Sequence, residues 1–418
     1  MNHSEFGIER IVARICNSDS TAEAFALYRF AAPLLRDYKF VFAADKGGSP
    51  GFAVNRNFSA GAAVRSLFRT ERVFVLDAMT AKEMESGPST YPIDYSISLD
   101  TNAMSYLVPH MAGKRGGRIP ADFQEVFEFI ARPDVFVDPL PYLTENLPRL
   151  ANGEPAEKIF ENFKAYEILR TLDVAWLKSN GEVRSTLSDQ ELAISAQRQV
   201  SEMYVDVGNT VMMGKLLFNH RYMYAFLVKM ATIQLKSPSA DPGKKMAAFL
   251  EFCHSTLATM SGREAAVARE YFTRGHNLAF FGKIQKRKKD ILNQLSNMAW
   301  DMWHVRQLEL SITFDRERQA RYFFPALLTF DQKLVEIMDL YPLKACAFKV
   351  GSAQSIPFFD GDPFRLIATD DEDGESVIQK YFSDEAIAAR AAVRDRVKAN
   401  FSEIVQLLEA ELLAVVGQ

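Results

Sequence analysis

The sequence predicts an α/β fold in which a parallel-sheet core is flanked by helices and interrupted by a long, mostly helical segment. Two short apolar strands, around residues 97–99 and 323–330, each end in an aspartate that a helix follows at once. Between these two units, residues 151–290 carry apolar side chains at helical spacing. Strands that alternate with helices are typical of parallel sheets, so the helical stretch is expected to be an insertion into one core.

The composition indicates a globular protein with no overall attraction to nucleic acid. The 418 residues are 48% hydrophobic and 24% charged, with a formal net charge of -4, so nucleic-acid binding would need a local basic patch. The three cysteines fit no metal-ligand spacing and predict buried thiols in a reducing compartment. The beginning of the chain lacks a signal-peptide pattern, and no apolar run reaches the length of about 18 residues that suggests a membrane span. We therefore expect a soluble, cytoplasmic protein with no membrane partner.

Residues 1–92 are expected to form a mixed α/β extension. The patterns predict helices at 22–35 and 60–68, strands at 38–44 and 72–77, and a glycine-rich loop at 45–51. The loop lacks the spacing of a P-loop, which favours a plain turn over an anion-binding cradle.

The rest of the chain divides into four further parts. Residues 93–150 hold the strand that ends at Asp100, a helix, a second short strand at 134–139 and the start of a new helix. Residues 151–290 form the helical insertion, and residues 291–350 return to the core with helices at 290–310 and 332–338 and strands at 323–330 and 344–350, the last an edge strand. Residues 351–418 begin with a loop and end with a helix or helix pair over 383–416, whose apolar face suits docking on the body or on a second subunit. The loop carries acids that favour a solvated surface run: Asp370, Asp371, Glu372 and Asp373.

Four acids stand in distinctive local settings. Asp100 and Asp331 each follow an apolar strand, and parallel neighbouring strands would bring them side by side at the sheet edge where ligands bind. Glu145 follows the second strand, and Asp301 lies inside a helix between tryptophans. Singly, the first three have simpler explanations as helix caps or first-turn acids. Asp301 has no capping role, and the four together favour a metal site over the simpler explanation.

In their order and contexts these acids resemble those of the PIN-domain nucleases. The matching runs are L-D-T-N at Asp100, P-L-P-Y-L-T-E at Glu145, A-W-D-M-W at Asp301 and L-T-F-D-Q-K-L at Asp331. The resemblance covers about residues 93–150 and 285–350. The gap between Glu145 and Asp301 is much longer than in a compact PIN domain, and the helical insertion accounts for it.

The resemblance implies a PIN-like core and a metal-dependent endonuclease that uses Mg²⁺ or Mn²⁺, acting on RNA more often than on DNA. PIN-like proteins are often toxins or parts of bacterial defence systems, which extends the expectation to those roles. Asp100 would be the central metal ligand, Asp331 and Asp301 would complete the set, and Glu145 would bind a second ion or orient the water. Clustered carboxylates repel one another, and hard divalent cations that prefer oxygen relieve this repulsion. The expected hydrogen-bond partners of the carboxylates are Thr101, Asn102 and Thr329.

A dense basic run, K-I-Q-K-R-K-K, precedes the helix of Asp301. Its basic side chains are Lys283, Lys286, Arg287, Lys288 and Lys289. A phosphate-binding patch and a solvated helix face remain equal alternatives. In the helix that follows, Trp300 and Trp303 can stack a base, although core packing is expected for at least one of them. His304 is expected on the surface against Trp300, with contact to a phosphate as the alternative.

Two other functions stay open at this point. One is a non-enzymatic PIN-like scaffold in a defence or regulatory complex, in which the acids no longer meet. The other is a metal-dependent phosphatase that acts on a small nucleotide, although the basic run favours a polymer. The helical insertion and the C-terminal helix are the expected surfaces for a protein partner or a second copy of the chain.

Overall fold

The computed structural model describes residues 3–49, 51, 54–114, 117, 119–313, 320–361 and 371–417. The chain folds into two compact units, and the general α/β prediction is confirmed. The first unit comprises Met1–Leu217, His304–Val335 and Leu343–Phe358, and the second comprises Phe218–Trp303, Glu336–Pro342 and Phe359–Gln418. No helix in the described part of the chain is long and apolar enough to cross a membrane.

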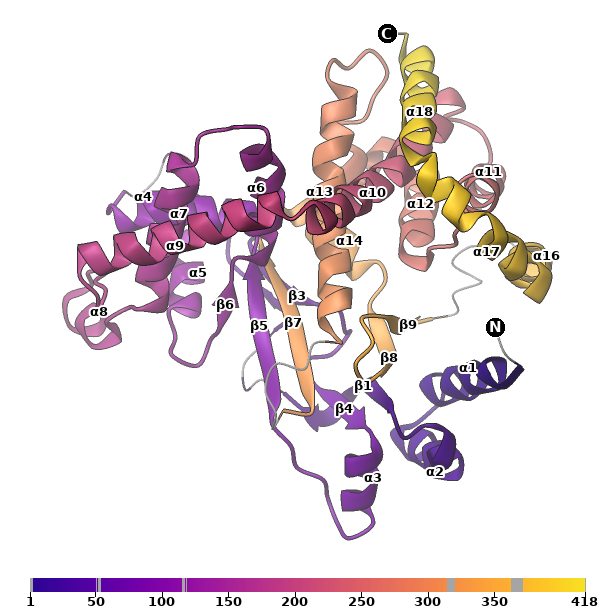
Figure 1. Ribbon diagram of the computed structural model, residues 1–418, viewed down its shortest axis with the longest axis horizontal. Helices are drawn as coiled ribbons and strands as arrows, with labels where there is room; N and C mark the ends of the chain where they lie inside the picture. Colours follow the sequence, from indigo (N-terminus) through magenta and orange to yellow (C-terminus); the bar gives the residue numbers. More distant parts are fainter. Residues whose placement is uncertain are drawn as a thin grey trace. The chain divides into compact units, whose positions relative to one another are not determined.

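A five-stranded sheet of mixed direction forms the centre of the first unit. Its strands, in spatial order, are β2 (Arg56–Asn57), β3 (Ala63–Ser66), β7 (Tyr322–Thr329), β5 (Ile93–Leu99) and β6 (Val137–Asp138). β5 lies parallel to both β6 and β7, whereas β3 pairs with β7 in the antiparallel sense (Figure 1). All eight residues of β7 are buried, as expected for a strand with neighbours on both sides and covered faces.

Helices that follow β5 and β6 pack together in the same unit. They are α4 (Thr101–Met111), α5 (Phe123–Ile130), α6 (Leu140–Ala151), α7 (Glu157–Arg170), α8 (Val174–Asn180) and α9 (Asp189–Gly208). α7 packs against α4 and α9, while α6 contacts α9 and β5. The first half of the predicted insertion at 151–290 therefore belongs to the unit that holds the sheet, and the second half belongs to the other unit.

A second sheet of four strands completes the first unit. Its spatial order is β4 (Val73–Leu76), β1 (Tyr38–Gly48), β8 (Leu343–Lys349) and β9 (Ser355–Phe359). The accompanying helical elements are α1 (His3–Cys16), α2 (Thr21–Ala31), η1 (Ala32–Leu34) and α3 (Ala78–Met84). Side chains of α1 and α2 share one buried apolar cluster with β1, β4 and β8. One face of this sheet is therefore shielded from solvent by the two helices.

The second unit is helical. It holds α11 (Pro242–Ser255), α12 (Gly262–Arg274), η2 (Gly275–Asn277), η3 (Ala279–Phe281), α16 (Asp371–Phe382), α17 (Asp384–Ala399), α18 (Phe401–Val416), most of α10 (Thr210–Lys236) and the first part of α13 (Ile291–Ser311). The remaining helix, α14 (Gln332–Asp339), is shared between the units. α18 docks on α10, because the Tyr224 hydroxyl donates to Glu409 at 2.8 Å and Lys229 pairs with Glu411 at 2.8 Å. The predicted helix pair is thus present, and its second helix docks on α10. Docking on a second subunit stays a prediction.

Two predictions for residues 1–92 are wrong. Residues 60–68 contain β3 instead of a helix, because Ala63–Ser66 pairs with the edge of β7 and this pairing overrides the local preference. The glycine-rich stretch is not a plain loop, since β1 continues to Gly48 through an irregularity that pairs both Ala43 and Gly48 with Val73. Gly47 is required there, because a Cβ at that position would lie 2.2 Å from the Val73 carbonyl oxygen.

Two predictions near the C-terminus also need correction. The strand predicted at 344–350 is β8, but it is not an edge strand, because β9 pairs along its outer side. Of the acidic cluster, Asp370 lies outside the described residues, and the backbone from Asp371 onward belongs to α16 and not to a loop. The three cysteines are buried free thiols, as expected.

Candidate functional site

Asp100 lies at the carboxyl end of β5 and caps α4. Its Oδ1 accepts the Ala103 N–H at 2.6 Å, and its Oδ2 accepts the Phe330 N–H at 3.3 Å. The second bond exists because β5 and β7 are parallel with Leu99 opposite Leu328, so the residues after both strands emerge together. Asp100 is only 6% exposed. Asp100 is therefore the N-cap of α4, as its simpler explanation expects.

Asp331 emerges at the same sheet edge, directly after β7 and before α14. The Asp331 N–H donates to the Thr329 hydroxyl at 3.0 Å, and the Asp331 carboxylate accepts the Lys333 N–H at 2.8 Å. The fully buried Thr329 also forms a side-chain hydrogen bond with Asp100. The predicted arrangement of two strand-end aspartates on neighbouring parallel strands is thus found, with Thr329 between them.

Glu145 reaches the same edge from α6. The Thr101 hydroxyl donates a hydrogen bond to Glu145 Oε2, which ties the start of α4 to α6. Arg149, one turn further along α6, lies 3.7 Å from Glu145 Oε1. The Nε2 atom of His304 lies 3.8 Å from Glu145 Oε2. Asn102, the third expected hydrogen-bond partner, is exposed.

His304 is buried, so the prediction of a surface histidine packed on Trp300 is wrong. Its ring is 3% exposed, and its Nδ1 lies 3.2 Å from Gln307 Oε1. The last turns of α13 lie against α6, where Gln307 Oε1 also accepts from the Thr144 hydroxyl at 3.4 Å. Trp300 stacks on His220 instead, with ring centroids 4.2 Å apart. His304 therefore faces the interior and not the solvent.

Burial and hydrogen bonding shift the pKa values of Asp100 and Glu145 in opposite directions. Burial raises the pKa of Asp100 above its ordinary value, although hydrogen bonds from Thr329 and the Ala103 N–H oppose the shift. Burial also acts to raise the pKa of Glu145, but hydrogen bonds from His304 and Thr101 and the charge of Arg149 outweigh it, so this pKa is lowered. Neighbouring carboxyl groups with divergent pKa values are typical of sites that divide acid and base roles.

The acids are not grouped as a metal centre in the described residues. No set of three or more His, Cys, Asp or Glu side chains there is close enough to hold a metal ion. Asp100, Glu145 and Asp331 belong to the first unit, whereas Asp301 belongs to the second and is partly buried on α13. Carboxylate oxygens are the ligands that Mg²⁺ and Mn²⁺ prefer, so the residue types suit such an ion. The positions of these side chains do not form a coordination site for it.

One further carboxylate at this sheet, Asp138 at the end of β6, was not among the predicted site residues. It accepts hydrogen bonds from the hydroxyls of Ser96 and Ser98 on β5 and from the Leu140 N–H. Parallel pairing of Ser98 with Asp138 brings these groups together. The signal was present in the sequence, because the second strand ends in an aspartate just as β5 does.

The basic run is an exposed loop of turns between η3 and α13 and not a helix face. Its five basic side chains are exposed, while Ile284 is buried and anchors the loop. Arg287 and Asp290 adopt positive φ values of 64° and 68°, which are uncommon for residues other than glycine. Trp303 packs in the core, as expected for at least one of the two tryptophans.

Comparison with known proteins gives no relative. The chain matches no protein-family model, no curated protein and no solved structure at a significant level.

Proposed function

We propose that the chain is a metal-dependent nuclease that hydrolyses phosphodiester bonds, with RNA as the favoured substrate. The observation that carries the proposal is that Asp100 and Asp331 follow neighbouring parallel strands at one sheet edge, which Glu145 also reaches with the buried His304 beside it. These residues come from four separate elements of the chain. Ligand and catalytic sites of open α/β sheets lie at this edge.

The proposed chemistry divides between the ion and the protein side chains. A bound Mg²⁺ or Mn²⁺ would acidify a water and stabilise charge on the leaving oxygen. Asp100 and Asp331 are the residues proposed to hold the ion, and Thr329 positions both through hydrogen bonds. Glu145, held by Thr101 and beside His304, is proposed to orient the water and to accept its proton. The predicted role of Asp301 as a further metal ligand stays a prediction, since Asp301 belongs to the second unit.

The test is cleavage of end-labelled RNA and DNA by the full chain with Mn²⁺, with Mg²⁺ and with EDTA. The informative variant is Asp100→Asn, because asparagine caps helices as well as aspartate does and so keeps the hydrogen bond to Ala103. We expect cleavage that depends on the ion and falls at least 100-fold in this variant, the loss roughly associated with removal of a charge-stabilising group. Cleavage that survives EDTA or the substitution would refute the mechanism.

A matched control separates charge from capping. Asp173 caps α8 through an equivalent hydrogen bond, from the Trp176 N–H at 2.9 Å, and stands outside the candidate site. Asp173→Asn therefore makes the same chemical change at an ordinary cap. Its activity should equal that of the wild type, whereas equal losses in both variants would indicate a folding effect.

A specific observation also favours the second candidate, a non-enzymatic scaffold. Asp100 and Asp331 already accept backbone N–H groups at the starts of α4 and α14, as ordinary caps do. If the folded wild-type chain cleaves neither RNA nor DNA under any of these conditions, the caps are the whole role of these acids and the scaffold is the better description.

A further inference from the structure

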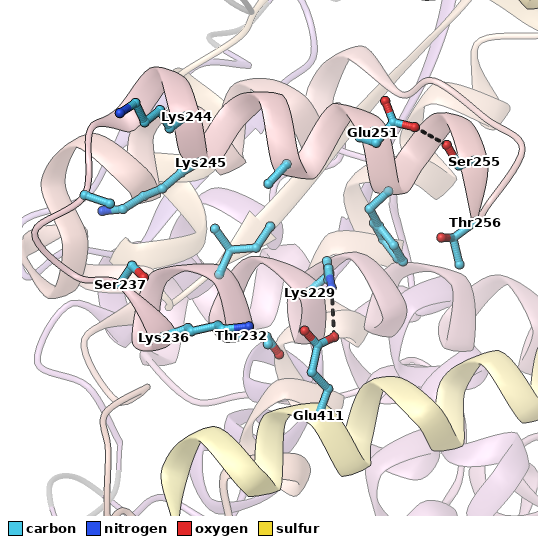
Figure 2. Close-up of a pocket in the computed structure, with 14 residues that line it drawn as sticks. Lys229, Thr232, Lys236, Ser237, Lys244, Lys245, Glu251, Ser255, Thr256 and Glu411 are labelled. Atoms are coloured by element: carbon cyan, nitrogen blue, oxygen red, sulfur yellow. Dashed lines mark hydrogen bonds and ion pairs between the residues drawn. The ribbon is translucent and has the colours of Figure 1, made fainter.

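A groove in the second unit lies between α10, α11 and α18 and encloses about 600 Å³ (Figure 2). This volume falls within the range of small-molecule sites, roughly 300–1,000 Å³. We call it the lysine groove after four of its lining residues, Lys229, Lys236, Lys244 and Lys245. All its lining residues belong to the second unit, so its geometry is independent of the candidate nuclease site.

Both carboxylates that line the lysine groove already have cationic partners. Glu411 of α18 pairs with Lys229 at 2.8 Å, a contact visible in Figure 2. Glu251 pairs with Lys380 at 2.9 Å. In the described part of the chain, no carboxylate lies within ion-pair distance of the three remaining lysines. Asp241 favours the charged form of Lys245 electrostatically but forms no ion pair with it. The groove therefore carries positive charge that the protein neutralises only in part.

Lys245 is the strongest single indication of a missing anion. It is 3% exposed, although a lysine is rarely buried without a counter-charge. Its ammonium donates to Gln234 Oε1 at 2.9 Å and to the Pro238 carbonyl at 2.7 Å, and both acceptors are neutral. An ammonium has three N–H groups, so one donor of Lys245 has no acceptor among the described residues.

The other lining groups suggest what kind of anion fits. The hydroxyls of Ser237 and Thr256 line the groove beside the lysines and suit hydrogen bonds to phosphate oxygens. The apolar side chains of Ile233, Ala248 and Phe252 form part of the wall, which favours a ligand with an organic body over a bare inorganic ion.

We propose that the lysine groove binds a phosphorylated small molecule of nucleotide size. Its phosphates lie against Lys236, Lys244 and Lys245, where the third N–H of Lys245 donates to a phosphate oxygen. The organic part lies against the apolar wall. This second site does not depend on the proposed nuclease activity.

The test is isothermal titration of the full-length protein with ATP, inorganic pyrophosphate, adenosine and a short single-stranded RNA. We expect ATP to bind, pyrophosphate to bind more weakly and adenosine not to bind. Affinity should fall as salt is raised, because the contacts are ionic. Pyrophosphate binding as tight as ATP would overturn the role of the apolar wall, and binding of RNA without ATP would overturn the proposal.

The matched variants are Lys236→Ala with Lys244→Ala, and Lys398→Ala as the control. All three side chains are exposed, so none of these changes should affect folding, and Lys398 on α17 does not line the groove. The double variant should bind ATP at least about tenfold more weakly, since charge-assisted hydrogen bonds to phosphate are the strong ones. Lys398→Ala should bind normally. Absence of ATP binding in the wild type, or equal binding by the wild type and the double variant, would refute the site.

Discussion

Replacement of Asp100 by alanine should destabilise the first unit more than loss of an ordinary helix cap. The side chain accepts the Ala103 N–H at 2.6 Å and the Phe330 N–H at 3.3 Å, and it is 6% exposed. Loss of the cap costs about 0.5–2 kcal/mol. The partly buried Phe330 N–H, left without this acceptor, costs about 1–3 kcal/mol more. The expected loss in the free energy of unfolding is therefore about 1.5–5 kcal/mol where Asp100 is uncharged, against about 1 kcal/mol for Asp173→Ala at a single cap. At neutral pH the loss is smaller, because alanine also removes the buried charge.

Replacement of Asp100 by asparagine should behave differently, because it removes the charge and keeps the cap. Burial raises the pKa of Asp100, so the folded state binds its proton more tightly than the unfolded state does. Between the ordinary pKa and the raised one, stability must fall as pH rises, and at neutral pH the buried charge is a net cost. Asparagine removes this cost and loses the weaker bond to Phe330. Asp100→Asn should therefore lie within about 1 kcal/mol of the wild type at neutral pH.

Urea unfolding without added metal, followed by far-ultraviolet circular dichroism across pH 4 to 7, measures all of these differences. The wild type should lose stability relative to Asp100→Asn as pH rises through the titration of Asp100. If Asp100→Ala costs no more than Asp173→Ala, the Phe330 contact and the burial contribute nothing. If Asp100→Asn is as destabilising as Asp100→Ala, the negative charge of Asp100 stabilises the fold, which contradicts the expected fall in stability as pH rises.

Two further predictions concern Glu145 and the bulge in β1. The pKa of Glu145 is lowered from its ordinary value of 4.5, so its contribution to stability is present above that pH and is lost as pH falls through the folded-state pKa. The stability of Glu145→Gln should therefore fall less steeply than that of the wild type as pH is lowered. Identical acid-unfolding curves of the two proteins by circular dichroism would contradict the hydrogen-bond network around Glu145. Gly47→Ala should cost about 1–3 kcal/mol in urea unfolding, because the new Cβ would lie 2.2 Å from the Val73 carbonyl oxygen. Gly7→Ala in α1 meets no neighbour within 4 Å and serves as the control, and equal stability of the two variants would show that β1 tolerates a side chain there.

The central strands were predictable because their sequences carry the information locally. β5 and β7 are apolar runs of strand length that end in an aspartate and a helix, and the structure places them as parallel neighbours. β3 was not predictable in the same way. Residues 60–68 are rich in alanine and suit a helix, and only pairing of Ala63 with Thr329, far along the chain, selects the strand. Such pairing is a tertiary effect that a local pattern does not contain.

The same distinction holds for the candidate site. Contact of Asp100 with Thr329 was predictable, because the strands that precede Asp100 and Asp331 end at one edge of the sheet. The burial of His304 depends on how the end of α13 packs on α6, which the helical period of α13 does not specify. Asp301, three residues earlier on α13, belongs to the second unit, so its expected meeting with Asp100 remains a prediction.

The pairing of β5 with β7 also has a consequence during synthesis of the chain. Leu99 pairs with Leu328, so the two strands leave the ribosome 229 residues apart (328 minus 99). At a synthesis rate of about 5–20 residues per second, β7 is made roughly 11–46 seconds after β5. β6 follows within 40 residues (137 minus 97) and covers one side of β5, while the other side stays open. The nascent chain must therefore keep an apolar strand edge from associating with other chains while all the intervening helices are made.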